Sequence, residues 1–121
     1  MSQAARSIFA FSLYLFFVGA TLVVVPNLLL GVLRIPETHE VWIRVVGMLA
    51  LVLGYYYYTA AKYEMTELMR ATVLARFAVL GFFIAFVVLG FAPIVLLVFG
   101  VVDAVAATWT ALALRQDGSP V

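Results

Sequence analysis

The sequence predicts an all-α integral membrane protein, a bundle of four transmembrane helices with a short interfacial helix after the first span. Of the 121 residues, 67% are hydrophobic and 11% are charged, whereas soluble domains are roughly 45–50% apolar and about 25% charged. A helix needs roughly 20 apolar residues to cross a hydrocarbon core about 30 Å thick. Four such stretches fill a single transmembrane domain, 1–121, at about 7–25, 41–61, 72–90 and 93–114.

The first span runs from Ser7 to Val25. A cleaved signal peptide is the competing interpretation, but the apolar run is longer than the 7–15 residues of a signal-peptide core and no A-x-A cleavage site follows it. Pro26 and Asn27 then end the helix, and the run LLLGVLRI is closed by Pro36. This run is too short to span and is restricted by proline on both sides, so we expect a turn of helix lying on the bilayer surface.

The second span runs from Val41 to Ala61 and carries a stripe of small residues. Gly47 and Gly54 lie seven residues apart on the face that also carries Arg44 and Tyr58, which favours close packing of another helix there. Four consecutive tyrosines, residues 55–58, lie near the far end of this span. Tyrosines at that level are typical of an aromatic belt at a membrane interface.

The third and fourth spans form a hairpin. The connection Lys62 to Ala71 is the most polar in the chain and is either a loop or a helical extension; Thr72 to Gly90 follows, with Arg76 just inside its start. Pro93 suits the first turn of the fourth helix. That helix should end at Arg115, and we expect residues 116–121 to be a frayed tail.

The positively charged residues predict the orientation. Arg34 and Arg44 lie toward one side of the membrane, and the opposite side holds Arg6, Lys62, Arg70, Arg76 and Arg115. Cytoplasmic loops carry the excess of lysine and arginine. We therefore expect a multi-pass protein with both termini in the cytoplasm.

Asp103 lies almost at the midpoint of the fourth span, PIVLLVFGVVDAVAATWTALAL. A charge there costs roughly 2.5–3.5 kcal/mol, so the carboxylate should face protein or water instead of lipid. Counting 1.5 Å per residue places Arg76 roughly 7–8 Å closer to the inner surface and Arg44 about 10 Å closer to the outer one. Arg76 is therefore the expected partner and Arg44 the second choice.

Other residues should support the pair of Asp103 and Arg76. The hydroxyls of Tyr55 and Tyr58 could donate hydrogen bonds to the same carboxylate. Small residues on the second and fourth spans should let neighbouring helices approach closely: Gly47, Gly54, Gly100, Ala104, Ala107 and Ala111.

Three interpretations of Asp103 remain open at this stage. The first is an ion pair between helices that fixes their register and adds little net stability. The second is a proton or cation site in a small transporter or channel. The third is a protonated carboxyl in the interface of a homo-oligomer.

Other chemistry has little support in the sequence. The chain has no cysteine and a net charge of +1, so we expect neither thiolate chemistry nor nucleic acid as a partner. His39 lies between Glu37 and Glu40, an incomplete set of zinc ligands that is better explained as a solvated loop. No hydroxyl has a base beside it, so the sequence predicts a protein that is no enzyme and has no catalytic residue, metal or cofactor.

The aromatic residues allow two interpretations. The chain holds ten phenylalanines, six tyrosines and two tryptophans, and the phenylalanines crowd the first and third spans. Packing between helices and against lipid explains them most simply. A surface or cleft for a flat hydrophobic molecule, such as a quinone, sterol or pigment, is the sharper alternative.

Several short motifs together carry a resemblance. They are the run from Pro26 to Pro36, Trp42-x-Arg44-x-x-Gly47, Gly54-Tyr55-Tyr56, Arg76 early in the third span and Asp103 in the fourth. This layout is similar to small four-helix bacterial membrane proteins of the DoxX-like and BphX-like kind. The resemblance implies an accessory or membrane-redox-associated role in the bacterial inner (plasma) membrane and carries over no catalytic residue.

Two functional hypotheses follow. The first is a non-enzymatic membrane accessory or hydrophobic-ligand-binding subunit, in a homo-oligomer or a larger membrane complex. The second is a small oligomeric transporter or channel that uses Asp103 as its proton or ion site. The size is also similar to that of small multidrug exporters, but those depend on a glutamate in the first helix, where this chain has no acidic residue.

Overall fold

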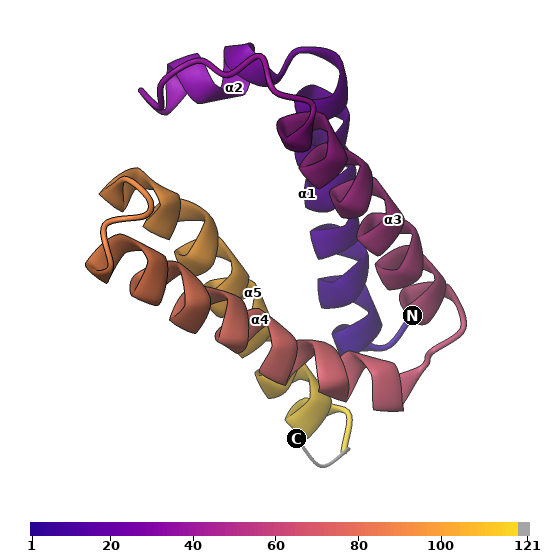
Figure 1. Ribbon diagram of the computed structural model, residues 1–121. Coiled ribbons are helices and arrows are strands. Elements are labelled where there is room, and N and C mark those ends of the chain that lie inside the picture. The colour runs from indigo at the N-terminus through magenta and orange to yellow at the C-terminus, as the bar shows by residue number, and fades with distance from the viewer. Residues whose placement is uncertain (119–121) are drawn as a thin grey trace.

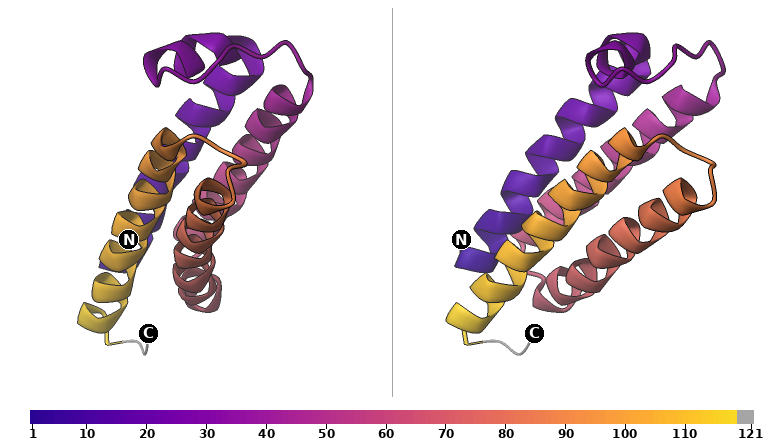
Figure 2. Two further views of the ribbon diagram at one scale, coloured as in Figure 1. Left: turned by 60° about the vertical axis from the view of Figure 1, so that its left-hand side comes forward. Right: turned by 90° about the vertical axis from the view of Figure 1, so that its left-hand side faces the viewer.

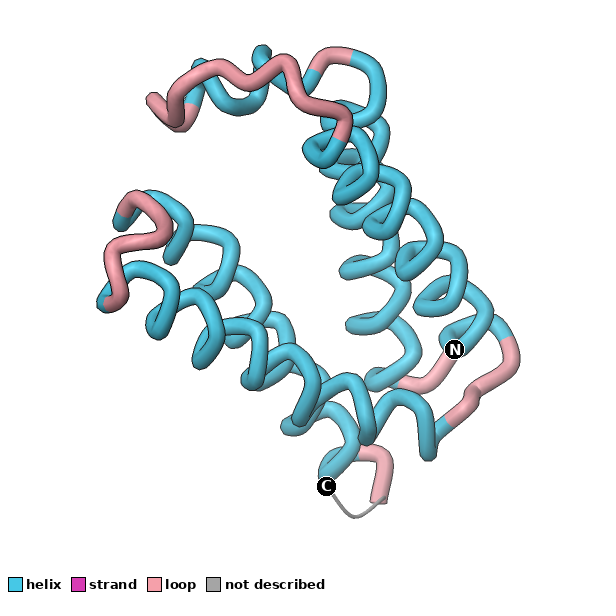
Figure 3. Tube along the Cα trace, viewed as in Figure 1, coloured by secondary structure: helices cyan, strands magenta, loops and turns pink. Residues whose placement is uncertain are grey.

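A computed structural model of the protein describes residues 1–118, and it is all-α, as the sequence predicts (Figure 1). Its elements are α1 (Gln3–Val24), α2 (Pro26–Val32), α3 (Trp42–Lys62), α4 (Thr66–Val88), the 3-10 turn η1 (Ile94–Leu96) and α5 (Leu97–Gln116). Short loops join them, and the described residues form no strand (Figure 3).

Four segments are long and apolar enough to cross a membrane: α1, α3, α4 and the continuous stretch Ile94–Gln116. The chain is therefore a multi-pass membrane protein, and the short helix expected after the first span is α2. The third span begins at Thr66 instead of Thr72, so much of the polar connection is helical, with Glu67 and Arg70 paired across one turn at 2.6 Å. The tail expected at residues 116–121 starts with the last residue of α5 and a turn at 117–118, and the rest of it lies outside the described residues.

The four spans form two hairpins arranged as a V (Figures 1 and 2). Helix α1 packs along α3 and helix α4 along α5, whereas contacts between the two hairpins are concentrated between α1 and α5. We call the first pair the α1–α3 hairpin, the second the α4–α5 hairpin, and the end where they meet the vertex. Both described chain ends lie near the vertex, and α2 lies across the open end (Figure 1).

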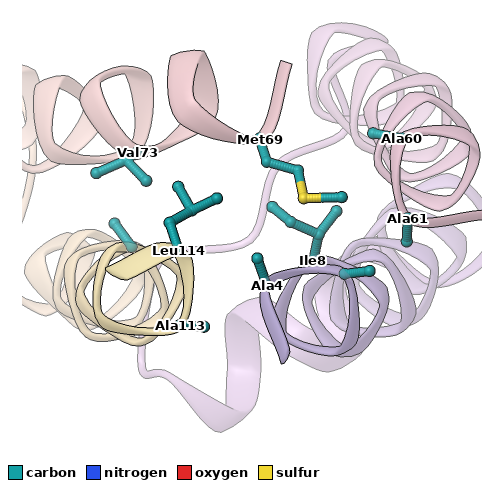
Figure 4. Close-up of a cluster of buried hydrophobic side chains, with 10 residues drawn as sticks. Ala4, Ile8, Ala60, Ala61, Met69, Val73, Ala113 and Leu114 are labelled. Atoms are coloured by element: carbon teal, nitrogen blue, oxygen red, sulfur yellow. The ribbon is translucent and has the colours of Figure 1, made fainter. Parts of the chain in front are cut away.

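The hydrophobic core lies at the vertex, where all four spans meet (Figure 4). Ile8, Met69 and Leu114 are its largest apolar side chains and are at most 1% exposed. Small residues fill the space between them and let the helices converge. They are Ala4, Ala5, Ala60, Ala61, Ala107 and Ala113.

Backbone contact at glycines holds the α1–α3 hairpin together. A Cβ atom added to Gly19 would lie 2.8 Å from the carbonyl oxygen of Gly47, and one added to Gly47 would lie 2.8 Å from the carbonyl oxygen of Gly19. No side chain fits at either position without moving a helix. In the other hairpin Gly100 lies against Leu80, where an added Cβ would approach the leucine Cδ1 to 2.9 Å.

Hydrogen bonds to the start of α1 close the vertex. The Glu64 carboxylate accepts from the backbone N–H of Ser2 at 2.8 Å and from its hydroxyl at 2.6 Å. The Asp117 carboxylate accepts from the backbone N–H of Gln3 at 3.3 Å and of Ala4 at 2.9 Å. We call these contacts the vertex clamp. They tie the amino end of α1 to the α3–α4 turn and to the end of α5, and they place carboxylates where the helix dipole favours negative charge.

Candidate functional site: a carboxylate in an apolar cavity

Asp103 lies on α5 with its side chain partly exposed and directed into a cavity between the hairpins. Within the part of the chain that the structure describes, its carboxylate accepts no hydrogen bond and forms no ion pair. An unpartnered carboxylate at the middle of a membrane span is costly. The site around it therefore needs explanation.

The cavity has a volume of about 250 Å³ and is lined almost entirely by apolar side chains. Helices from both hairpins form its walls, and residues of α2 and the following loop cover its outer end. Asp103 is the lining residue of α5 that lies closest to the vertex. The other lining residues are Val18, Leu22, Leu29, Leu30, Leu33, Ile35, Ile43, Val46, Val79, Phe83, Leu96 and Phe99.

Arg76 lies between this cavity and the vertex and is 1% exposed. Its Nε donates to the backbone carbonyl of Thr72 at 3.2 Å, and its Nη2 donates to the hydroxyl oxygens of Thr72 at 3.1 Å and Thr110 at 2.9 Å. Arg76 and Thr72 are one helical turn apart on α4, and Thr110 faces them from α5. Acceptor oxygens from two helices, α4 and α5, thus bind one guanidinium.

The polar cluster extends from Thr110 to α1. The hydroxyls of Thr110 and Ser7 lie 2.7 Å apart, and the Ser7 hydroxyl donates to the carbonyl of Ala4 at 2.7 Å. Three helices, α1, α4 and α5, are therefore joined by one chain of hydrogen bonds. Since lipid offers no competing partners, such bonds contribute to association of the spans.

Aromatic rings surround the rest of the guanidinium. The Cζ atom of Arg76 lies 4.9 Å from the ring centre of Phe11 and 5.7 Å from that of Tyr57. Tyr14 stacks on Phe11 with ring centres 5.3 Å apart. Ring faces stabilise a cation without supplying an acceptor atom, and Nη1 of Arg76 is the one buried side-chain polar atom of the described residues without a hydrogen-bond partner.

The expected direct ion pair between Arg76 and Asp103 is not formed. The two groups interact electrostatically through space, but the guanidinium is bound by the threonines. The reason is the direction of the side chains. Each Cα–Cβ bond of a helix tilts toward its N-terminus, and α4 and α5 are antiparallel, so Arg76 extends toward the vertex while Asp103 extends toward the open end.

The alternative partners of Asp103 are also placed elsewhere. Arg44 donates from Nη1 to the carbonyls of Val23 and Val24 and so caps the end of α1. Tyr55 is 61% exposed and Tyr58 is 36% exposed, and neither donates to the carboxylate. Consecutive residues of a helix lie on different faces. Of the four tyrosines in this run, Tyr57 is the one that contacts the Arg76 guanidinium.

The small residues expected at helix interfaces divide between the hairpins. Gly47 packs against α1 at Gly19, and an added Cβ at Gly54 would lie 3.0 Å from the Phe16 ring. Gly100 faces α4. Ala107 is fully buried in the core, Ala111 packs against that core, and Ala104 is partly buried.

The surroundings of Arg76 include residues that the sequence alone does not single out. They are the hydroxyl residues Ser7, Thr72 and Thr110 and the aromatic residues Phe11 and Tyr57. A signal for two of them exists in the sequence. Thr72 precedes Arg76 by four residues, so both lie on one helix face. Thr110 follows Asp103 by seven residues, roughly 10 Å closer to the inner end at 1.5 Å per residue, which is the depth that an arginine directed toward the vertex reaches.

Comparison with known proteins adds no assignment: no family model, no curated protein and no solved structure matches the chain.

Proposed function

We propose that this protein binds a small hydrophobic molecule from the membrane in the cavity between its hairpins, as a non-enzymatic accessory or ligand-binding subunit. The observation that carries the proposal is the cavity itself. It is lined by residues of both hairpins and of α2, and the described residues that line it are apolar apart from Asp103. Ligand sites typically combine apolar walls with a few placed polar groups.

The size of the cavity restricts the ligand. At about 250 Å³ it lies just below the roughly 300–1,000 Å³ of typical small-molecule sites. The ligand should therefore be compact, or should leave part of its length outside among the lipids. The V-shaped arrangement supports entry from the bilayer, because the hairpins separate at the open end (Figure 1).

Saturable photolabelling tests this proposal. The protein is reconstituted in phosphatidylcholine nanodiscs and labelled with a neutral aryl diazirine, with and without an excess of the same compound lacking the diazirine. We expect the competable label on peptides that carry Leu22, Phe83 and Phe99. Label on outward-facing residues should not be competed, because lipid-dissolved reagent reaches them without a site.

Two matched variants separate cavity binding from labelling at the lipid surface. Val79→Phe adds a ring inside the cavity, and we expect it to abolish the competable label. Val105→Phe makes the same change on the outer face of α5, where Val105 is 65% exposed, and should leave labelling unchanged. Equal labelling of all three proteins would contradict the proposal.

A second candidate function is a small transporter or channel that uses Asp103 as a proton or cation site. The unpaired carboxylate favours it, since a structural ion pair would have left no free charge at this depth. The test is cation and proton flux into proteoliposomes, compared between wild type and Asp103→Asn. Flux in the wild type that the variant loses supports transport, and no flux in either protein contradicts it.

The setting of the protein belongs to the same proposal. The distribution of lysine and arginine supports both termini in the cytoplasm, and the resemblance to DoxX-like and BphX-like proteins supports an accessory role in a bacterial inner membrane. Small residues on more than one span support a homo-oligomer or a larger complex. Because the chain has no cysteine, single cysteines test the orientation. Glu37→Cys should react with an impermeant maleimide on intact cells, and Tyr63→Cys only after permeabilisation; the reverse pattern would refute the orientation.

A further inference from the structure

We infer that the ligand of this cavity is a compact amphiphile whose protonated amine pairs with Asp103. The inference rests on the proposed function and specifies its ligand class. Asp103 is the one charged residue among the described residues that line the cavity. It lies at the vertex-side end of an otherwise apolar wall, so the site matches a molecule with one charged end and a hydrocarbon body.

The protein itself leaves the carboxylate without a contact partner. The guanidinium of Arg76 is bound by Thr72 and Thr110 and enclosed by aromatic rings. The guanidinium of Arg44 is bound to carbonyls at the end of α1. Neither arginine lines the cavity, so a molecule that enters it meets the carboxylate and not a guanidinium.

The chemistry of the site selects the charge of the ligand. A carboxylate is an acceptor of hydrogen bonds, and an ammonium offers donors together with the opposite charge, which makes each bond shorter and stronger than a neutral one. A hydroxyl supplies a donor without the charge. A carboxylate ligand would place two like charges together in an apolar cavity, which the low local dielectric penalises.

The geometry also orients the ligand. With the amine at Asp103, the body would extend away from the vertex between Leu22, Phe83 and Phe99 toward α2. The ammonium then lies at the carboxylate and the hydrocarbon next to apolar side chains. The reverse orientation would bury an ammonium beneath the leucines of α2 without an acceptor, at a large desolvation cost.

A series of three compounds on one hydrocarbon cage tests the inference: 1-adamantylamine, 1-adamantanol and 1-adamantanecarboxylate. Binding is measured by equilibrium dialysis against protein in phosphatidylcholine nanodiscs, with empty nanodiscs as the blank. We expect the amine to bind wild type at least about tenfold more tightly than the alcohol, and the carboxylate to bind least. Asp103→Asn should reduce the affinity for the amine to that for the alcohol and leave the alcohol unchanged.

Val79→Phe serves as the second variant and separates the two proposals. It should weaken amine and alcohol equally, because it removes space and no charge. Equal affinity of amine and alcohol for wild type, with both lost in Val79→Phe, would overturn the charge preference and retain the apolar site. Binding that neither variant changes, or no binding above empty nanodiscs, would overturn both.

Discussion

Arg76 is the largest fully buried side chain of the described residues, and it is bound without a carboxylate. Threonine oxygens accept three hydrogen bonds from it, and ring faces stabilise the remaining charge. A guanidinium stays protonated at any depth, so its acceptors determine whether the helices around it can associate. Thr110 is the central acceptor, because it joins the guanidinium to Ser7 on α1.

Replacing this hydroxyl should destabilise the protein. Thr110→Val keeps the shape of the side chain but removes one hydrogen-bond partner from Arg76 and one from Ser7, and a buried polar group that loses a hydrogen bond costs about 1–3 kcal/mol. We expect a lower free energy of unfolding in detergent titrations. Thr108→Val is the matched control, because the exposed Thr108 hydroxyl donates only to the carbonyl of Ala104 in its own helix. Equal effects of the two changes would contradict a central role of Thr110.

Asp103→Asn should behave differently from a broken ion pair. Because the carboxylate has no bonded partner among the described residues, the substitution removes no direct contact. It loses only the through-space attraction to Arg76 and takes away a charge that is costly in the membrane. We expect the unfolding temperature in detergent to be equal to that of wild type or higher. A clear loss of stability would indicate an ion pair that the structure does not contain.

At this scale the sequence identifies the two charged residues of the site but not their partners. Asp103 and Arg76 stand out because charges are rare in apolar spans. Their contacts depend on the direction of side chains in antiparallel helices, and depth counted along the chain does not include that direction. Ser7, Thr72 and Thr110 look like ordinary small polar residues until three helices bring them together.

At the scale of the helices, backbone contact between α1 and α3 defines the first hairpin. Gly19 and Gly47 face each other so closely that an added Cβ on either would lie 2.8 Å from the carbonyl oxygen of the other. Backbone atoms cannot rotate away as a side chain can. The helices must therefore separate to admit any larger residue.

Gly19→Ala should lower the free energy of unfolding by about 1–3 kcal/mol, the typical cost of adding a carbon to a well-packed interface. Unfolding in mixed micelles measures it. Gly81→Ala is the matched control, since an added Cβ on that helical glycine meets nothing within 4 Å. If both changes leave stability unaltered, the close contact is not part of the folded interface.

The sequence predicts elements well because length and apolar composition decide what can span a bilayer. Pro26 also marks the start of α2, and Gly90 and Pro93 mark the turn between α4 and α5. The start of α4 differs because the polar residues from Thr66 onward still form helix outside the apolar run. Small residues indicate which helix faces pack against one another. Gly19, the partner of Gly47, becomes evident only when the two helices are aligned.

At the scale of the molecule, the two hairpins are joined at the vertex and separate at the open end (Figure 1). The core and the polar cluster lie at or near the vertex, and the vertex clamp adds hydrogen bonds from Glu64 and Asp117. The sequence does not predict this V, because a side chain that faces lipid is as apolar as one that faces another helix. Hydrophobic patterning therefore contains little information about where two hairpins meet.

The clamp predicts a dependence of stability on pH. Hydrogen bonds from the hydroxyl and then the backbone N–H of Ser2 lower the pKa of Glu64 below its ordinary value of 4.5. A carboxyl group with a lowered pKa in the folded state stabilises the protein above its ordinary pKa, and this contribution is lost as the pH falls through the folded value. We expect the unfolding temperature to fall below pH 4.5 in wild type and to fall less in Glu64→Gln.

Glu40→Gln provides the control for this experiment. It removes the same charge from the exposed loop before α3, away from the vertex, and should retain the pH dependence of wild type. Identical pH profiles for wild type and Glu64→Gln would show that the carboxylate does not contribute through its charge. The effect should be modest, because water competes for an exposed carboxylate.

The vertex clamp has a consequence for the order in which the protein is made. Ala4 leaves the ribosome early, yet its amide bonds to Asp117, 113 residues later. Membrane insertion of the first helix can therefore precede completion of its amino-terminal cap by the synthesis of 113 residues. A nascent chain in which α1 and α3 have inserted but Asp117 has not yet left the ribosome would lack the two hydrogen bonds that join the amino end of α1 to the end of α5.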